Sequence, residues 1–178
     1  MIEVIEKKYH PKNRNHTIHI AIAPTKNLDR TEYFVEKATE IGIDEISFIY
    51  TKHSERKNLN LERIEKIGVS AIKQSLKFYL PLFNPMTSFE EFIGQKREGQ
   101  LFVAHESTPS TRHLLNLALS NTTYTVLIGA EGGFSEEEVQ NAIHRGFTPV
   151  SLGESRLRTE TAALAACFAL NFLQIIKI

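Results

Sequence analysis

The chain alternates short apolar runs with amphipathic helical segments, and the first such alternation constrains the fold most. Residues 18–23 (IHIAIA) form a run typical of a strand. Apolar residues then recur at helical spacing through residues 34–41, and Gly42 predicts the end of that helix. A second strand-type run follows at residues 46–50. Two strands joined by one helix of this length predict a right-handed parallel crossover, so we expect an α/β fold.

The rest of the chain repeats this pattern. Residues 61–76 predict a helix that the two prolines of LPLFNP end, and a short helix is expected at residues 89–93. Three further strand-type runs are each followed by a loop and a helical segment, and the last of these segments is rich in alanine. The strands are expected at residues 101–104, 124–128 and 149–152, and the last helix at residues 160–176. Such alternation predicts a parallel sheet covered by helices.

Composition excludes several classes of protein. With 178 residues, of which 42% are hydrophobic and 24% charged, the chain can bury one substantial core. No apolar run approaches the length of a membrane span, and the start MIEVIEKKYH lacks the pattern of a signal peptide, so we expect a cytoplasmic protein without a membrane partner. The single cysteine, Cys167, excludes disulfides and cysteine-based metal sites, and no metal is expected. Basic and acidic residues balance at 21 each, so net charge gives little indication of a polyanion partner.

The stretch LIGAEGGFSEEEV, residues 127–139, predicts a loop between a strand and a helix. Ser135 and Glu138 have the spacing of a capping box, which marks the helix start. Before it, Gly129, Gly132 and Gly133 leave the backbone free to take positive φ and allow another molecule to approach closely. This glycine loop, residues 129–133, is typical of a ligand site. An ordinary strand-to-helix turn, with glycines for tight packing, explains the same residues equally well.

The helix start favours a ligand without phosphate. A helix N-terminus stabilises an anion by about 0.3–1 kcal/mol. Three consecutive glutamates, residues 136–138, would each oppose a negative charge at roughly 8 Å by about 0.5 kcal/mol in water. They cancel the favourable contribution, and the lysine and Ser/Thr of a P-loop are also missing. A neutral or partly cationic ligand fits better.

A second loop pairs with the first. SLGESRLRTETAALAA, residues 151–166, combines a strand end, one glycine and two arginines with the start of the alanine-rich helix. The loops after parallel strands gather at one edge of a sheet. Residues 105–107, the glycine loop and residues 152–161 are therefore expected to line one pocket.

Both loops, with EKATEIGIDEI, SERKN and SAIKQS upstream, resemble the RsmE family of SPOUT-class methyltransferases, which methylate N3 of a uridine in small-subunit (16S) ribosomal RNA. The resemblance covers roughly residue 18 to the C-terminus. It implies a SPOUT-type parallel sheet flanked by helices, with a C-terminal trefoil knot in which S-adenosylmethionine binds in a bent shape. The chain departs from the family pattern at Ala130, where proline is common, and at residues 155–158, which read SRLR instead of RILR.

The resemblance also implies the residues of the cofactor site. A sulfonium is cationic and carries no phosphate, which agrees with the acidic helix start. The cofactor is expected against a set of residues from three loops: Ala104, Gly129, Glu131, Gly132, Leu152, Gly153, Leu157 and Ala162.

The expected catalytic residues are Arg158 and Glu131. Arg158 would steady negative charge on the uracil or fix the phosphate of the nucleotide. The alternative is an arginine at the helix entry that pairs with Glu131 or Glu160. We expect Glu131 to orient the loops through backbone N–H groups rather than to remove the proton. The group that removes it is not identified, because His53, His105 and His113 are each explained equally well as surface or structural histidines.

RNA contacts are expected from basic residues outside the cofactor pocket. Arg56 and Lys57, with Lys73 on the following helix, would form a strip facing RNA, although a solvated helix face explains them nearly as well. Arg156 and Arg158 would add to it. Residues 1–16, which are basic and aperiodic, are expected to be a remnant of the family's N-terminal PUA-like RNA-binding domain or a linker, and residues 17–178 the catalytic domain.

Partners follow from the same resemblance. It implies 16S ribosomal RNA or the small ribosomal subunit as substrate, and a homodimer in which each protomer completes the other's active site. Two other functions remain open at this point. A different SPOUT enzyme acting on transfer RNA or another ribosomal position would need the same cofactor pocket, whereas an RNA-binding module without catalysis would leave the glycine loops unexplained.

Overall fold

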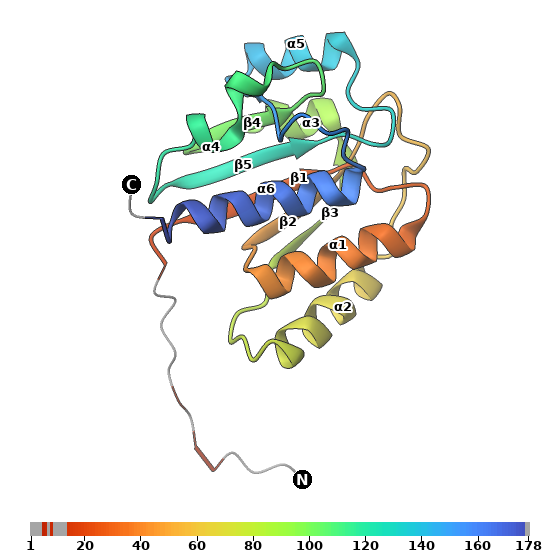
Figure 1. Ribbon diagram of the computed structural model, residues 1–178. Coiled ribbons are helices and arrows are strands. Elements are labelled where there is room, and N and C mark those ends of the chain that lie inside the picture. The colour runs from red at the N-terminus through yellow and green to blue at the C-terminus, as the bar shows by residue number, and fades with distance from the viewer. Residues whose placement is uncertain (1–4, 7, 9–13, 177–178) are drawn as a thin grey trace.

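The computed structural model describes residues 5, 6, 8 and 14–176. Within them, six strands form one sheet in the order β3-β2-β1-β5-β4-β6, and every neighbouring pair is parallel (Figure 1). The strands are β1 (Thr17–Ile22), β2 (Glu45–Tyr50), β3 (Leu82–Ser88), β4 (Gln100–Ala104), β5 (Thr123–Ile128) and β6 (Thr148–Val150). The helices are α1 (Leu28–Ile41), α2 (Leu61–Gln74), α3 (Phe89–Gly94), the 3-10 turn η1 (Ser110–Arg112), α4 (Leu114–Leu117), α5 (Glu136–His144) and α6 (Thr159–Leu173). The predicted α/β fold with a parallel sheet is confirmed.

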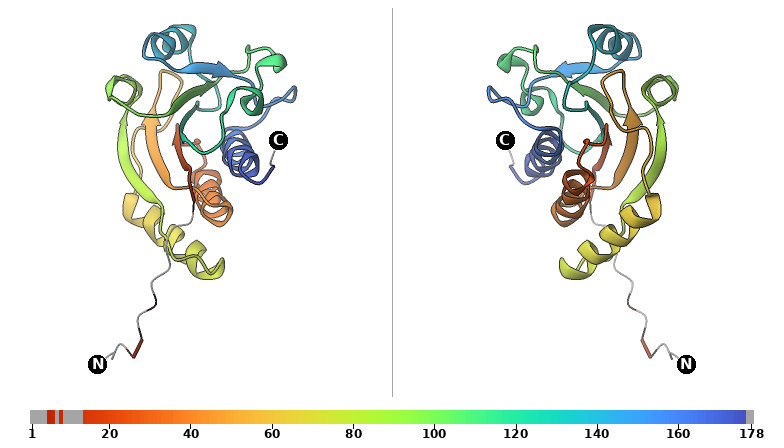
Figure 2. Two further views of the ribbon diagram at one scale, coloured as in Figure 1. Left: turned by 90° about the vertical axis from the view of Figure 1, so that its left-hand side faces the viewer. Right: turned by 90° about the vertical axis from the view of Figure 1, so that its right-hand side faces the viewer.

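Helices cover both faces of the sheet. One hydrophobic core joins the sheet to α1, α2, α4 and α6, and a second joins the other face to α3 and α5. The end views in Figure 2 place α1 and α6 together on one side of the sheet. In β1, Ile18 and Ile20 belong to the first core and Ala21 to the second, because successive side chains of a strand point to opposite faces. Burial on both faces explains why the strands read as continuous apolar runs.

The predicted helix boundaries are confirmed where they depend on caps. Gly42 ends α1 with φ 119°, and its N–H donates to the Ala38 carbonyl. Ser135 and Glu138 form both bonds of the capping box: the Glu138 N–H donates to Ser135 Oγ over 3.3 Å, and the Ser135 N–H donates to Glu138 Oε2 over 2.7 Å. The end of the β5 strand and the start of α5 therefore fix both ends of the glycine loop.

Strand β3 differs from the sequence expectation, which predicts only a helix end at LPLFNP. The strand includes Pro85, and a proline cannot donate a hydrogen bond to a neighbouring strand. It is tolerated because β3 is an edge strand of the described sheet. Its pairing with β2 is irregular: Ser47 pairs with Asn84 and Ile49 with Thr87, so β3 has one more residue than β2 between these two pairs.

The segment that leads from β6 into α6 is hydrogen-bonded to the connection between β4 and β5. The Ser151 N–H donates to the Arg112 carbonyl, and the Leu114 N–H donates to the Ser151 carbonyl, both over 3.0 Å. Helix α6 then packs against α1, β1 and β5. Small side chains, Ala163 and Ala166, face this contact and are completely buried, so the helix approaches closely. The trefoil knot that the resemblance implies for this part of the chain stays a prediction.

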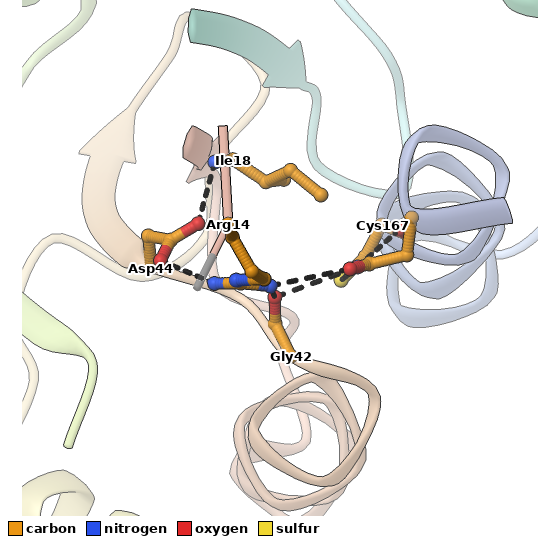
Figure 3. Close-up of polar contacts among 6 residues, drawn as sticks. Arg14, Ile18, Gly42, Asp44 and Cys167 are labelled. Carbon is orange, nitrogen blue, oxygen red and sulfur yellow. Dashed lines mark hydrogen bonds and ion pairs between the residues drawn. The ribbon is translucent and has the colours of Figure 1, made fainter. Parts of the chain in front are cut away.

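Arg14 anchors the start of the described domain (Figure 3). Its guanidinium forms an ion pair with Asp44, donates to the Gly42 carbonyl over 2.6 Å and reaches the Asn171 side chain on α6. Most of residues 1–16, the expected remnant of an RNA-binding domain, lie outside the described residues. Within that segment, the Arg14 side chain contacts Asp44 before β2, Gly42 at the end of α1 and Asn171 on α6. It does not extend into solvent as part of a basic arm. In the described part of the chain no helix has the length and apolar character needed to cross a membrane.

Candidate cofactor and RNA site

A cavity of about 510 Å³ lies where the chain leaves β4, β5 and β6. These three strands are neighbours in the sheet and parallel, so the loops after them meet at one edge. The volume is in the range of small-molecule sites, about 300–1,000 Å³. The cavity is lined by residues 104–106, 128–131, 133, 151–159 and 162.

The expected cofactor residues gather at this cavity with one exception. Ala104, Gly129, Glu131, Leu152, Gly153, Leu157 and Ala162 all line it. Gly132 does not line it and faces the loop after β2 instead. A Cβ on Gly132 would lie 3.0 Å from His53 Cβ and 3.3 Å from His53 Cγ. Glycine at this position therefore makes room for His53.

Gly129 is required by the turn itself. A Cβ there would lie 2.9 Å from the carbonyl carbon of Gly133 and 3.1 Å from the Phe134 nitrogen. The turn is closed by the Gly133 N–H, which donates to the Ala130 carbonyl over 2.8 Å. Gly133 has φ 68°, which a residue with a side chain rarely adopts. The glycines thus shape the loop that walls the cavity.

The lining suits a ligand that is apolar over most of its surface and cationic at one point. Leu152, Leu157 and Ile128 supply apolar walls, and a Cβ on Gly153 or Gly133 would meet nothing within 4 Å. Acidic side chains at the cavity come from all three loops: Glu106, Glu131 and Glu154. Arg156 and Arg158 line the cavity as well, and Arg156 pairs with Glu106. The carboxylates still outnumber the arginines, so a cationic sulfonium is tolerated and the residues present fit S-adenosylmethionine.

Glu131 holds two loops together. Its Oε1 accepts from the Lys26 N–H over 2.9 Å, which ties the loop after β1 to the glycine loop. A contact of this kind, between Glu131 and a backbone N–H, is expected from the sequence. Because Lys26 contributes its backbone, no pattern of side chains could have revealed the contact.

Arg158 is positioned at the N-cap of α6, where its side chain is exposed and lines the cavity. Its carbonyl accepts from the Ala162 N–H, whereas its guanidinium makes no hydrogen bond or ion pair with the described residues. The carboxylates expected as alternative partners contact other groups instead, since Glu131 Oε1 accepts from the Lys26 N–H and Glu160 Oε1 lies 3.9 Å from Arg30. The guanidinium of Arg158 is therefore available to a ligand.

The residues expected to contact RNA lie in separate places. Arg56 donates from Nε to the Lys26 carbonyl over 2.7 Å, and Lys57 Nζ lies 5.9 Å from the centre of the Tyr50 ring, so both follow β2 at the cavity edge of the sheet. Arg156 lies at the cavity and pairs with Glu106 over 3.5 Å. Lys73 lies in the last turn of α2, which runs back towards the start of β3. Lys73 therefore does not join Arg56 and Lys57 in one strip.

Two of the three histidines have structural contacts. His53 Nδ1 lies 3.1 Å from the Gly132 carbonyl oxygen, and His113 Nδ1 accepts the Leu115 N–H at the start of α4. His105 lines the cavity, with Nε2 at 4.0 Å from a carboxylate oxygen of Glu136. Within the described part of the chain, no cluster of three or more His, Cys, Asp or Glu side chains is arranged to hold a metal ion.

Comparison with known proteins identifies the family of this chain. A family model described as an RNA methyltransferase domain matches residues 12–171. Ribosomal RNA small subunit methyltransferase E of Mesomycoplasma hyopneumoniae is 30% identical over 169 residues, covering 92% of this chain and 72% of that protein. This chain belongs to the ribosomal RNA small subunit methyltransferase E family. The family member from Rickettsia conorii is 28% identical, and the match covers 88% of this chain but only 65% of that protein's length.

Solved structures of similar proteins share the fold. A probable rRNA-methyltransferase from Porphyromonas gingivalis is 40% identical with a TM-score of 0.85, and the match covers 95% of this chain and 72% of that chain. The family member from Neisseria gonorrhoeae, solved with S-adenosylmethionine bound, is 26% identical with a TM-score of 0.82, covering 89% of this chain and 66% of that chain. The solved structures similar to this chain thus include a family member with its cofactor bound.

Proposed function

We propose that this chain is an S-adenosylmethionine-dependent methyltransferase that methylates N3 of a uridine in 16S ribosomal RNA. One observation carries the proposal. The loops that hold the family motifs converge on a single cavity whose lining is largely apolar and rich in glycine, with three carboxylates beside two arginines. A cofactor with a cationic sulfonium and no phosphate is compatible with this lining, and the two arginines are available to the nucleotide.

The cofactor supplies an activated methyl group, and the chain's own residues place it and the nucleotide. Methylation at N3 forms a nitrogen–carbon bond, breaks a sulfur–carbon bond and releases the N3 proton. Negative charge develops on the uracil as this proton leaves. The guanidinium of Arg158 at the cavity stabilises that charge or holds the adjoining phosphate. Glu131 acts on the geometry, because its bond to the Lys26 N–H holds two loops in place.

We also propose roles for the basic residues near the cavity and for the N-terminal segment, and a place in the cell where the protein acts. The basic residues Arg56, Lys57 and Arg156 contact RNA phosphates near the cavity. Residues 1–16 are the end of an RNA-binding domain or a linker to it. Because the target is ribosomal, we expect the protein to act in the cytoplasm on small ribosomal subunits.

We also propose a homodimer formed through α6. The Phe168 and Phe172 rings stack with centroids 5.7 Å apart, and these residues remain 57% and 42% exposed in the single chain. Adjacent exposed aromatic residues on a helix that borders the site are typical of a protein–protein contact. Both phenylalanines lie in the C-terminal half of α6, about 15 Å or more along the helix from Arg158 at the cavity.

Two measurements test the function. Isothermal titration calorimetry with S-adenosylmethionine separates an enzyme from an RNA-binding module, which would show no binding. Transfer of a tritiated methyl group to small ribosomal subunits, with transfer RNA as the competing substrate, then separates RsmE activity from that of another SPOUT enzyme. We expect binding and label only in the ribosomal RNA. Label in transfer RNA alone would contradict the proposed substrate.

A further inference from the structure

The carboxylate of Glu138 has a second contact that helix capping does not require. It is buried, with the residue 8% exposed. Oε2 closes the capping box by accepting from the Ser135 N–H, whereas Oε1 accepts from the Lys52 N–H over 2.8 Å. Lys52 follows β2, so this bond links α5 to a loop 86 residues away in sequence. A capping box is complete without that bond.

The loop that starts with this bond is basic. Residues 51–57, here called the basic loop, contain Lys52, His53, Arg56 and Lys57. Lys52, His53 and Lys57 are exposed, and Arg56 is half-buried. The loop turns tightly, because the Thr51 N–H donates to Ser54 Oγ and the Ser54 N–H donates to the Thr51 carbonyl. Its side chains therefore project from a compact base.

A second link joins the basic loop to the glycine loop. His53 Nδ1 lies 3.1 Å from the Gly132 carbonyl oxygen and 3.3 Å from that of Gly133. A carbonyl can only accept, so Nδ1 carries the ring proton and donates it. The absence of a side chain on Gly132 permits this contact. His53 thus contacts the glycine loop through Gly132, the residue of that loop that does not line the cavity.

A third link runs through the loop after β1. Arg56 donates to the Lys26 carbonyl, and the Lys26 N–H donates to Glu131 Oε1 on the glycine loop. Lys26 Nζ also pairs with Glu55 over 2.8 Å. The basic loop is therefore held at three points: on the first turn of α5 through Glu138, on the glycine loop through His53, and indirectly on Glu131 through Lys26. Of these contacts, only the bond to Glu138 is made by a buried carboxylate.

We propose that Glu138 is a positioning residue that holds the basic loop on the first turn of α5, next to the glycine loop, so that RNA phosphates bound by Lys52, Arg56 and Lys57 are placed at a fixed distance from the cofactor. Lysine and arginine side chains at such a loop recognise the phosphate backbone of RNA. Glu138 does not line the cavity, so its effect falls on RNA engagement rather than on cofactor affinity. The RNA part of this inference rests on the proposed function, whereas the attachment of the loop does not.

The test compares Glu138→Ala with two controls. Ser135→Ala removes the other half of the capping box and leaves the bond to Lys52. Glu137→Ala removes an exposed carboxylate from the same helix turn. Hydrogen exchange at the Lys52 amide should be at least about tenfold faster in Glu138→Ala and unchanged in both controls, since the bond to a buried carboxylate is lost only there. Unchanged exchange in Glu138→Ala would overturn the attachment.

The functional arm measures methyl transfer to small ribosomal subunits lacking the modification. We expect the KM for the subunits to rise at least about fivefold in Glu138→Ala, with the Kd for S-adenosylmethionine within twofold of the wild type and kcat changed less than KM. His53→Ala, which alters an exposed residue, should give the same pattern if Glu138→Ala does not fold. Faster exchange with an unchanged KM would overturn the positioning role. If the wild type binds cofactor but transfers no methyl group, the proposed function fails, and exchange at Lys52 alone decides the attachment.

Discussion

Gly129 is the position in the glycine loop where one added methyl group should disturb the cofactor site most directly. The Cβ of Gly129→Ala would lie 2.9 Å from the Gly133 carbonyl carbon and 3.0 Å from Gly133 Cα. Ordinary contacts begin at 3.4 Å, so the turn must open by about half an ångström, and the obstructing atoms belong to backbone rather than to a side chain that can rotate away. Overpacking of this kind costs about 1–3 kcal/mol.

The cost should appear in cofactor binding. The free protein can relieve the clash by lengthening the bond between the Gly133 N–H and the Ala130 carbonyl, whereas the bound protein must keep the loop closed. A cost of about 1–3 kcal/mol corresponds to a Kd for S-adenosylmethionine raised roughly 5- to 150-fold. Calorimetry measures this change, and circular dichroism checks that the variant is folded.

Gly94→Ala is the matched control. A Cβ on Gly94, at the end of α3, would meet nothing within 4 Å, so this variant should bind the cofactor as the wild type does. If Gly129→Ala also kept wild-type affinity, the glycine loop would not form the wall of the cofactor site and the reasoning from the close backbone approach would be refuted.

Three further predictions concern catalysis, pH and assembly. Arg158→Ala should lower methyl transfer roughly 100-fold while cofactor affinity by calorimetry changes less than threefold, and a parallel loss of affinity would contradict its catalytic role. Burial, with the nearby charge of Arg97 as a second cause, lowers the pKa of His19 from 6.5 to about 3. The unfolded chain therefore binds a proton between these pH values that the native protein does not, and stability falls as the pH falls. In urea unfolding between pH 6 and 4, His19→Gln should remove roughly 1.4 kcal/mol per pH unit of that decrease, and an unchanged slope would contradict the assignment. Phe168→Glu should give a monomeric mass by light scattering where the wild type is a dimer, and a wild-type monomer at micromolar concentration would count against the dimer.

Much of the sheet could be predicted because its signals are local. The alternation of strand and helix periods gives all of the described strands except β3, and caps such as Gly42 and the Ser135–Glu138 pair give helix ends. Strand β3 could not be predicted, since Pro85 argues against a strand unless the strand is known to lie at an edge. Edge position is a property of the whole sheet.

The site could likewise be predicted only in part from the sequence. The loops that line the cavity follow strand ends, so their convergence could be predicted from parallel topology alone. Gly132 has a different role, because its partner is His53, a residue 79 positions away that no local pattern connects to it. Lys73 is displaced from the expected strip because α2 runs antiparallel to the strands, which carries its last turn away from the cavity edge. The position of Lys73 thus depends on the direction in which α2 crosses the sheet, which the residue type does not reveal.

Mapping of methylated nucleosides tests the central claim most directly. Small-subunit ribosomal RNA from cells lacking the protein would be compared by mass spectrometry with RNA from the same cells supplied with the wild-type chain or with Arg158→Ala. The proposed function predicts that one N3-methyluridine is absent without the protein and returns with the wild-type protein but not with the variant. If every methylated uridine of the small subunit is retained without the protein, and a methylated nucleoside of transfer RNA is lost instead, the proposed substrate is wrong.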